Sequence, residues 1–194
     1  MTIEFYDTHA HDFFQRTKAV DMSRLYEPFL AMVPSGGHIL DAGCGSGRDA
    51  KAFFELGYRV TAFDASQELV KLATVYTGLP ILCMTFEKMD FEAAFDGIWA
   101  CASLLHVTRA QMVPIFRRFI RALKVGGVWY VSYKWGQSER EKDGRKFTDF
   151  DEPGFMTFVR QFPCLAVERI WQTADLRPDR PGEKWLNVLL RRAC

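Results

Sequence analysis

The sequence lacks long apolar runs and any organised set of cysteines. No stretch approaches the roughly 20 consecutive apolar residues of a membrane-spanning helix. Residues 1–14 mix polar and aromatic side chains, without the apolar centre of a secretory signal peptide. The five cysteines form neither a C-x-x-C pair nor a zinc-ligand spacing, so we expect small buried residues of a reduced compartment. These features predict a cytoplasmic protein with no membrane partner.

Metal ligands are also scarce in the sequence. His9 and His11 lie beside Asp12, but two histidines two residues apart do not share a helix face. No third ligand follows at a suitable spacing. We therefore expect no metal site.

The composition is that of one folded domain with an uneven charge. The chain has 194 residues, of which 48% are hydrophobic, enough to bury a sizeable core in a single domain spanning 1–194. The net charge is +1, but residues 1–100 carry 8 basic and 14 acidic side chains, and residues 101–194 carry 17 and 10. This asymmetry is compatible with an anionic partner, such as nucleic acid, and with charges spread over a solvated surface.

The most informative stretch is residues 37–48, which read G-H-I-L-D-A-G-C-G-S-G-R. An apolar run ends in Asp41, and three glycines follow at alternate positions before a helical pattern begins at Arg48. Glycines there permit positive φ angles and let the backbone approach a ligand closely. The N-terminus of the following helix offers free N–H groups and positive potential. The stretch therefore predicts a ligand-binding strand–turn–helix unit.

The glycine spacing, D-x-G-x-G-x-G, differs from the G-x-G-x-x-G of dinucleotide-binding proteins. It resembles motif I of the class I S-adenosylmethionine-dependent methyltransferases, where an acid ends the first strand and the glycine loop holds the methionine part of the cofactor. The G-S-G-R-D run resembles small bacterial methyltransferases of the tellurite-resistance type. Asp64 ends the next expected strand, at the position whose carboxylate accepts both ribose hydroxyls in the family.

The resemblance implies a site for S-adenosyl-L-methionine, with S-adenosyl-L-homocysteine as the product. In the family an acid and a small residue follow the third strand and bind the adenine. Thr85 and Phe86 stand at those positions, so threonine replaces the acid. The expected contact with the adenine is then made by the backbone near Phe86. The expected cofactor-binding residues are Asp41, Gly43, Gly45, Gly47, Arg48, Asp64, Ala65, Thr85, Phe86, Cys101, Phe13 and Thr17.

Periodicity and the Gly and Pro positions predict alternating strands and helices over the rest of the chain. Two strands near the C-terminus are joined without a helix and must therefore be antiparallel. We predict an α/β, Rossmann-like doubly wound sheet of seven strands, mostly parallel with an antiparallel C-terminal strand, and helices on both faces. The expected strands are 38–41, 58–64, 81–84, 95–102, 128–134, 165–173 and 185–191, and the helices 22–33, 48–56, 66–76, 108–124 and 154–162.

Two segments are expected to border the site away from the glycine loop. Residues 1–33 correspond to an N-terminal helical segment that folds over the cofactor cleft in the family. Residues 136–151 are polar and strongly charged, and we expect an inserted loop after the fifth strand. The candidate lid residues, which packing on the core would explain equally well, are Tyr6, Phe13, Arg16 and Thr17.

The acceptor is expected to bind between the ends of the fourth and fifth strands. His106 follows the fourth strand, in a segment that resembles the lining of the methyl-transfer cleft, and histidine titrates near neutrality. His106 is therefore the candidate catalytic residue, as a base or a substrate contact, with a structural histidine as the alternative. Lys134 and Arg145 are the candidate substrate-binding residues, with a solvated loop as the alternative for Arg145.

Three functions fit these features. The main hypothesis is a methyltransferase acting on an O, N, S or softer nucleophile of a small molecule. The alternatives are a methyltransferase acting on RNA or protein, and a non-catalytic module that binds S-adenosylmethionine. Residues 102–105 read A-S-L-L, where enzymes that methylate adenine or glutamine amides carry a D/N-P-P-Y/F tetrad, so that specificity is not expected.

Overall fold

The apolar run before the glycines forms strand β1 (His38–Ala42), near the middle of the main sheet. It pairs in parallel with β2 (Arg59–Asp64) and with β4 (Phe95–Ala100). The computed structural model describes residues 2–177, 180 and 182–194, and in this part of the chain seven strands form one sheet in the order β3-β2-β1-β4-β5-β9-β8. The remaining strands are β3 (Ile81–Cys83), β5 (Leu123–Lys134), β8 (Leu165–Ala174) and β9 (Lys184–Arg192).

The C-terminal strand β9 runs against its neighbours, as the sequence predicted. It pairs antiparallel with β5 and with β8, whereas the other strand pairs of this sheet are parallel. The predicted seven-stranded, mostly parallel sheet is thus confirmed. Strand β5 begins at Leu123, earlier than expected, because Leu123 already pairs with Phe95 ahead of the Gly126–Gly127 dipeptide.

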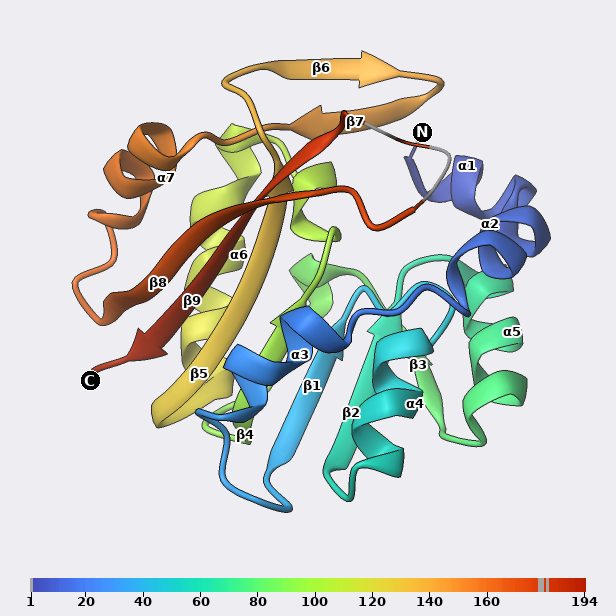
Figure 1. The fold of residues 1–194 in the computed structure, drawn as a ribbon, viewed down its shortest axis with the longest axis horizontal. Coiled ribbons are helices and arrows are strands. Elements are labelled where there is room, and N and C mark those ends of the chain that lie inside the picture. Colours follow the sequence, from blue (N-terminus) through green and yellow to red (C-terminus); the bar gives the residue numbers. More distant parts are fainter. Residues whose placement is uncertain (1, 178–179, 181) are drawn as a thin grey trace.

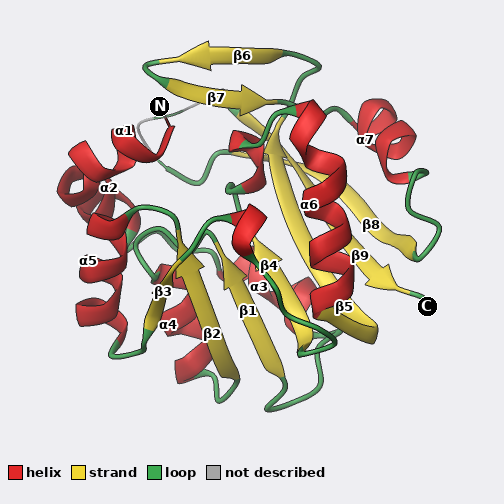
Figure 2. Cartoon of the chain, turned by 180° about the vertical axis from the view of Figure 1, so that it is seen from behind, coloured by secondary structure: helices red, strands yellow, loops and turns green. Residues whose placement is uncertain are grey.

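Helices cover both faces of the sheet (Figures 1 and 2). Neighbouring residues of β4 show the two sides: Ile98 packs in one core cluster with helix α6, and Trp99 packs in another with helices α3 and α4. Among the described residues, no helix is both long and apolar enough to cross a membrane. These helices are α3 (Ser23–Leu30), α4 (Arg48–Glu55), α5 (Gln67–Thr77), α6 (Arg109–Ala122) and α7 (Glu152–Val159).

The N-terminal segment is helical, with α1 (Thr2–Thr8) and α2 (Ala10–Thr17) ahead of α3. Both helices lie beside α5, at the edge of the sheet where the parallel strands end (Figure 1). Helix α3 is shorter than the expected 22–33. It begins at Ser23, whose backbone N–H donates to Asp21 Oδ1 (2.9 Å).

Residues 136–151 were expected as a loop, and this expectation is wrong. They contain a β-hairpin, β6 (Glu139–Lys142) paired antiparallel with β7 (Arg145–Thr148). The two-residue turn is Asp143-Gly144, with φ angles of 51° and 71°, which is the Asp-Gly signature of a tight hairpin. Because most side chains of this segment are charged, its sequence does not show the apolar–polar alternation typical of a strand. The hairpin lies across the carboxyl ends of the strands, close to α1 (Figure 1).

Two of the five cysteines depart from the expected reduced state. Cys164 and Cys194 form a disulfide, with their Cα atoms 5.2 Å apart. The pairing of Leu165 with Arg192 in the β8–β9 ladder brings the two ends together, and a sequence separation of 30 gives no hint of that register. Of the other cysteines, Cys44 is buried but Cys83 is exposed.

Candidate functional site

A cavity of about 970 Å³ opens over the carboxyl ends of the parallel strands. It collects side chains from α1, α2, the glycine loop, the end of β2, the segment after β4, the hairpin and the two C-terminal strands. Asp41 and Gly47 do not line it. The expected site residues that do are Phe13, Thr17, Gly43, Gly45, Arg48, Asp64, Ala65, Thr85, Phe86, Cys101, His106, Lys134 and Arg145.

The glycine loop requires glycine for two different reasons. Gly43 has a φ angle of 78°, and a Cβ atom there would lie 2.5 Å from the Cβ atom of Ser103. Gly47 has a φ angle of 76°, and its Cβ would lie 2.7 Å from Thr77 Cγ2 on α5. The first glycine lets the loop pass Ser103 beside the cavity, and the last lets α4 pack on α5. The loop is anchored by the Gly43 and Cys44 N–H groups, which donate to Phe63 O.

Asp64 connects the end of β2 to the glycine loop at the cavity wall. Its Oδ2 accepts from the Gly45 N–H (2.8 Å), and its Oδ1 accepts from the Ser66 N–H (2.9 Å). Burial raises the pKa of Asp64, and these backbone donors oppose that effect. The capping of α5 is provided by Ser66, whose Oγ accepts from the Leu69 N–H (3.2 Å).

Asp41 lies behind the glycine loop and is almost fully buried. One of its carboxylate oxygens, Oδ2, has no hydrogen-bond partner among the described residues. Burial and the nearby charge of Asp49 raise the pKa of Asp41 well above its usual range. A buried carboxylate with an unpartnered oxygen favours the approach of a positive group or a proton.

A second buried carboxylate, Asp49, supports the start of α4, and the sequence analysis did not identify it. Its oxygens accept from the Tyr26 hydroxyl (2.5 Å), the Trp99 Nε1–H (2.8 Å) and the Arg48 Nε–H (2.6 Å). Against the raising effect of burial, the Arg48 guanidinium holds the pKa of Asp49 below its usual value. The adjacent Arg-Asp pair was the only signal in the sequence, because Tyr26 and Trp99 come from distant elements.

His106 lies at the other end of the cavity, and its contacts fix its tautomer. The backbone carbonyl of Lys146 can only accept, so His106 Nδ1 carries the hydrogen of this 2.7 Å bond. His106 Nε2 therefore accepts from the Tyr6 hydroxyl of α1 (2.8 Å). Burial lowers the pKa of His106 to about 4, and the charges of Arg145 and Lys134 act in the same direction. The imidazole is neutral at pH 7.

Arg145 and Lys134, the two expected substrate-binding residues, both reach the outer end of the cavity. The Arg145 guanidinium lies 4.1 Å from the Phe5 ring centroid and 5.2 Å from that of Phe147. Its Nε is buried and has no hydrogen-bond partner in the part of the chain that the structure describes. The Lys134 Nζ donates to Glu183 Oε2 (2.6 Å), and burial lowers the pKa of Lys134.

Asp175 and Arg177, which follow β8, and Trp185 of β9 line the cavity and were not expected from the sequence. Asp175 accepts from Arg177 Nη2 (2.5 Å) and from the Trp185 indole (3.0 Å), and all three side chains line the cavity. No motif marks them, because only the β8–β9 pairing brings them to the site. Within the described part of the chain, no three His, Cys, Asp or Glu side chains are grouped as metal ligands.

A family model described as a methyltransferase domain matches residues 39–127. Over these residues, the chain is similar in sequence to methyltransferase domains. The matched residues run from β1 to the middle of β5, and include the glycine loop and Asp64. The cofactor that this resemblance implies, and that the cavity is tested against below, is S-adenosylmethionine.

Known methyltransferases resemble the chain in sequence and in fold. A ubiquinone biosynthesis O-methyltransferase of Xanthomonas axonopodis pv. citri is 31% identical over 121 residues, which are 59% of this chain and 50% of that protein. The chain spans about half the length, or less, of the curated relatives that it matches.

Solved structures match nearly the whole chain at lower identity, which is evidence for the fold. The 1,6-didemethyltoxoflavin-N1-methyltransferase of Burkholderia thailandensis, solved with S-adenosylhomocysteine, has a TM-score of 0.81 at 23% identity, covering 99% of this chain and 87% of that one. A TehB-like methyltransferase of Corynebacterium glutamicum has a TM-score of 0.74 at 21% identity, covering 95% and 98%.

Proposed function

We propose that the chain transfers a methyl group from S-adenosylmethionine to a small-molecule acceptor. The observation that carries this proposal is the shared cavity. It joins the glycine loop and Asp64 at one end to His106, Lys134 and Arg145 at the other. Its volume of about 970 Å³ suits two small ligands side by side. Helix α1 covers the outer end, which favours a small acceptor over a macromolecule.

The residues of the inner end fit the cofactor. Asp41 lies behind the glycine loop and outside the cavity lining, so we propose that its unpartnered Oδ2 attracts the ammonium group of the methionine part from there. Asp64 stands at a strand end where a carboxylate can accept from two ribose hydroxyls. The other residues proposed to hold the cofactor line the cavity: Gly43, Gly45, Arg48, Ala65, Thr85, Phe86, Cys101, Phe13 and Thr17. Gly47 does not line it, and its proposed part is to let α4 pack on α5 behind the loop.

The protein's part in the transfer is mainly positioning and the exclusion of water. The cofactor supplies a methyl group on a positively charged sulfur, which is already activated for in-line attack. Helix α1 and the hairpin close over the acceptor end through the Tyr6–His106 bond and a bond from the Lys146 N–H to Thr2 Oγ1 (3.1 Å). Such closure holds the two ligands in one geometry and removes water from between them.

Binding and turnover test the proposal separately. Calorimetry should show S-adenosylhomocysteine binding and no tight binding of NADH. A coupled assay for S-adenosylhomocysteine formation, run over a pooled set of small nucleophiles, should then give turnover. Cofactor binding without turnover on any small molecule would favour the non-catalytic module. Salt-sensitive retention of RNA would favour a nucleic-acid acceptor.

A cytoplasmic location also stays a prediction. The prediction assumed that all five cysteines are reduced. The Cys164–Cys194 disulfide contradicts this assumption, because disulfides are rare in the cytosol. Cell fractionation with a non-reducing gel would report both the location and the state of this pair.

A further inference from the structure

The outer end of the cavity has a charge pattern that the inner end does not share. Asp41, Asp49 and Asp64 surround the glycine loop with one cation, Arg48. Basic side chains outnumber carboxylates at the outer end, where Glu4 of α1 also lines the cavity and two other carboxylates are paired with bases. The basic groups are Lys134, Arg145, Lys146, Arg177 and Arg180, with Asp175 paired to Arg177 and Glu183 paired to Lys134 and Arg180.

Lys146 is exposed, and among the mostly buried cations at this end Arg145 has the longest ion pair. Its nearest carboxylate is Asp143 at 3.5 Å, in the exposed turn of the hairpin. Its guanidinium is held instead between the rings of Phe5 and Phe147, and only 16% of its side chain is exposed. Among the described residues the buried Nε–H has no acceptor, although the guanidinium also bonds the Tyr6 side chain. A buried charged donor without an acceptor is costly, so a ligand that accepts from it would be bound.

The groups around His106 offer no base suited to neutral pH. His106 has a pKa of about 4 because it is buried, and its Nε2 lone pair is already taken by Tyr6. Burial raises the pKa of Tyr6, so its hydroxyl stays protonated. Burial lowers the pKa of Lys134, which still pairs with Glu183. A general base works best with a pKa near the working pH. Because none of these groups meets that condition, the acceptor has to bind already deprotonated at its attacking atom.

We propose that the acceptor is a small anion whose negative charge lies on, or is conjugated with, its attacking atom, and that Arg145 selects it through the unpartnered Nε–H. This inference rests on the proposed methyl transfer. In the step, a lone pair of the attacking atom forms the bond to the methyl carbon. The carbon–sulfur bond breaks and its electron pair stays on sulfur. No proton leaves, and the methylated product has lost the charge that Arg145 held.

A chromophoric probe can test this selection without the natural acceptor. 4-Nitrophenol reports its own ionisation by colour, and 4-nitroaniline is a neutral molecule of similar shape. With the full chain saturated with S-adenosylhomocysteine, we expect the pKa of bound 4-nitrophenol to fall by about one unit or more, a tenfold preference for the phenolate. At pH 8, 4-nitroaniline should bind at least about tenfold more weakly.

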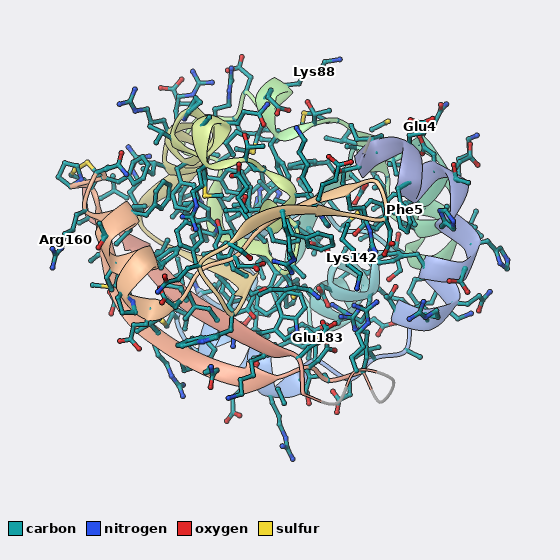
Figure 3. The ribbon with its side chains drawn as sticks, turned by 90° about the horizontal axis from the view of Figure 1, so that it is seen from above. Glu4, Phe5, Lys88, Lys142, Arg160 and Glu183 are labelled. Atoms are coloured by element: carbon teal, nitrogen blue, oxygen red, sulfur yellow. A yellow bond between two sulfur atoms is a disulfide. The ribbon has the colours of Figure 1, made fainter. Side chains whose placement is uncertain are left out.

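Variants of one hairpin supply the controls. Arg145→Gln should remove most of the pKa shift of the probe, and Arg145→Lys, which keeps the charge but not the Nε–H, should keep part of it. Lys142→Gln removes an exposed charge from the same hairpin and should leave the shift unchanged. Figure 3 shows Lys142 and Phe5 on the hairpin and helix that cover the cavity.

The outcomes separate this inference from the proposed function. A wild-type chain that binds S-adenosylhomocysteine but does not bind 4-nitrophenol, or binds it with an unshifted pKa, overturns the anion site and leaves the function standing. The same shift in Arg145→Gln would also overturn it. Failure to bind S-adenosylhomocysteine counts against the function itself. Should Arg145→Gln not fold, the Arg145→Lys result decides, because a full shift there contradicts selection by Nε–H.

Discussion

The two ends of the cavity are built in different ways. At the glycine-loop end, some partners are close in the chain or lie on adjacent strands, as when Gly45 donates to Asp64 or Arg48 pairs with Asp49. Asp49 also accepts from two buried donors of distant elements, Tyr26 and Trp99. At the outer end, contacts join segments far apart in sequence. Tyr6 and His106 are 100 residues apart, and His106 and Lys146 are 40 apart.

The two ends of the cavity also differ in how firmly their side chains are held in place. The inner end is held by the sheet and by a buried carboxylate with three donors, so it should be formed before any ligand arrives. The outer end depends on the docking of α1 on the hairpin, and those contacts are few. We therefore expect substitutions at the inner end to affect folding and cofactor binding, and those at the outer end to affect the acceptor.

The largest effect is expected from Asp49→Asn. It removes the charge that pairs with the buried Arg48 guanidinium and weakens the bonds from Tyr26 and Trp99. Breaking a buried ion pair costs about 3–5 kcal/mol, so denaturant unfolding should show a loss of that size. Glu68→Gln is the control, because the Glu68–Lys71 pair is exposed and is worth about 1 kcal/mol or less. A loss of unfolding free energy below about 1 kcal/mol for Asp49→Asn would show that this ion pair does not stabilise the inner end more than an exposed pair would.

Gly43→Val should abolish cofactor binding. Valine disfavours a φ angle of 78°, and its Cβ would meet Ser103 at 2.5 Å, so the loop has to move away from the cavity. Titration should show S-adenosylhomocysteine affinity reduced by more than about 100-fold, or 2.7 kcal/mol. Gly57→Ala is matched in φ (89°) but has nothing within 4 Å of the added Cβ, so it should lose some stability and no affinity. Normal affinity in a folded Gly43→Val protein would contradict the role of the loop.

Asp64→Ala should weaken the cofactor without unfolding the chain. Loss of hydrogen bonds to a charged group costs about 1.5–3 kcal/mol, which is a roughly ten- to hundredfold weaker affinity for S-adenosylhomocysteine. Calorimetry measures the affinity, and circular dichroism checks that the Gly45 and Ser66 ends of the site remain folded. Unchanged affinity would end the assignment of Asp64 to the ribose.

The effect expected at the outer end, from His106, is small at neutral pH and grows as the pH falls. Burial lowers the pKa of His106 to about 4, and the charges of Arg145 and Lys134 on neighbouring strands also oppose its protonation. Its hydrogen-bond partners, the Tyr6 hydroxyl and the Lys146 carbonyl, are neutral. As pH falls from 6.5 to 4, the unfolded chain takes up this proton first, so His106 lowers the free energy of unfolding by up to about 1.4 kcal/mol per pH unit.

The His106→Asn variant isolates this contribution from the carboxylates that titrate in the same range. The stability difference between wild type and His106→Asn should shift in favour of the variant as pH falls from 7 to 4.5. Unfolding curves at several pH values measure it. An equal difference at both ends of the range would show that His106 is not buried in its neutral form, and so that α1 does not close on it.

The sequence predicted the fold and the inner end better than the outer end. The strand–glycine–helix unit was recognised because its residues are contiguous, and the absence of a helix between the last two strands predicted their antiparallel pairing. The charged residues of the hairpin predict a loop, although Asp143-Gly144 has the sequence of a tight hairpin turn. Asp49 was missed because two of its donors lie on other elements.

The sequence by itself determined what depends on neighbours in the chain: the glycine loop, the strand-ending Asp64, and the order of strands and helices. Only the tertiary structure decided which side chains meet at the acceptor end. It placed Tyr6 on His106, buried Arg145 between Phe5 and Phe147, and joined Cys164 to Cys194. The physical reason is that strand register and helix docking are set by the burial of the whole core, and no local pattern records how distant segments share that burial.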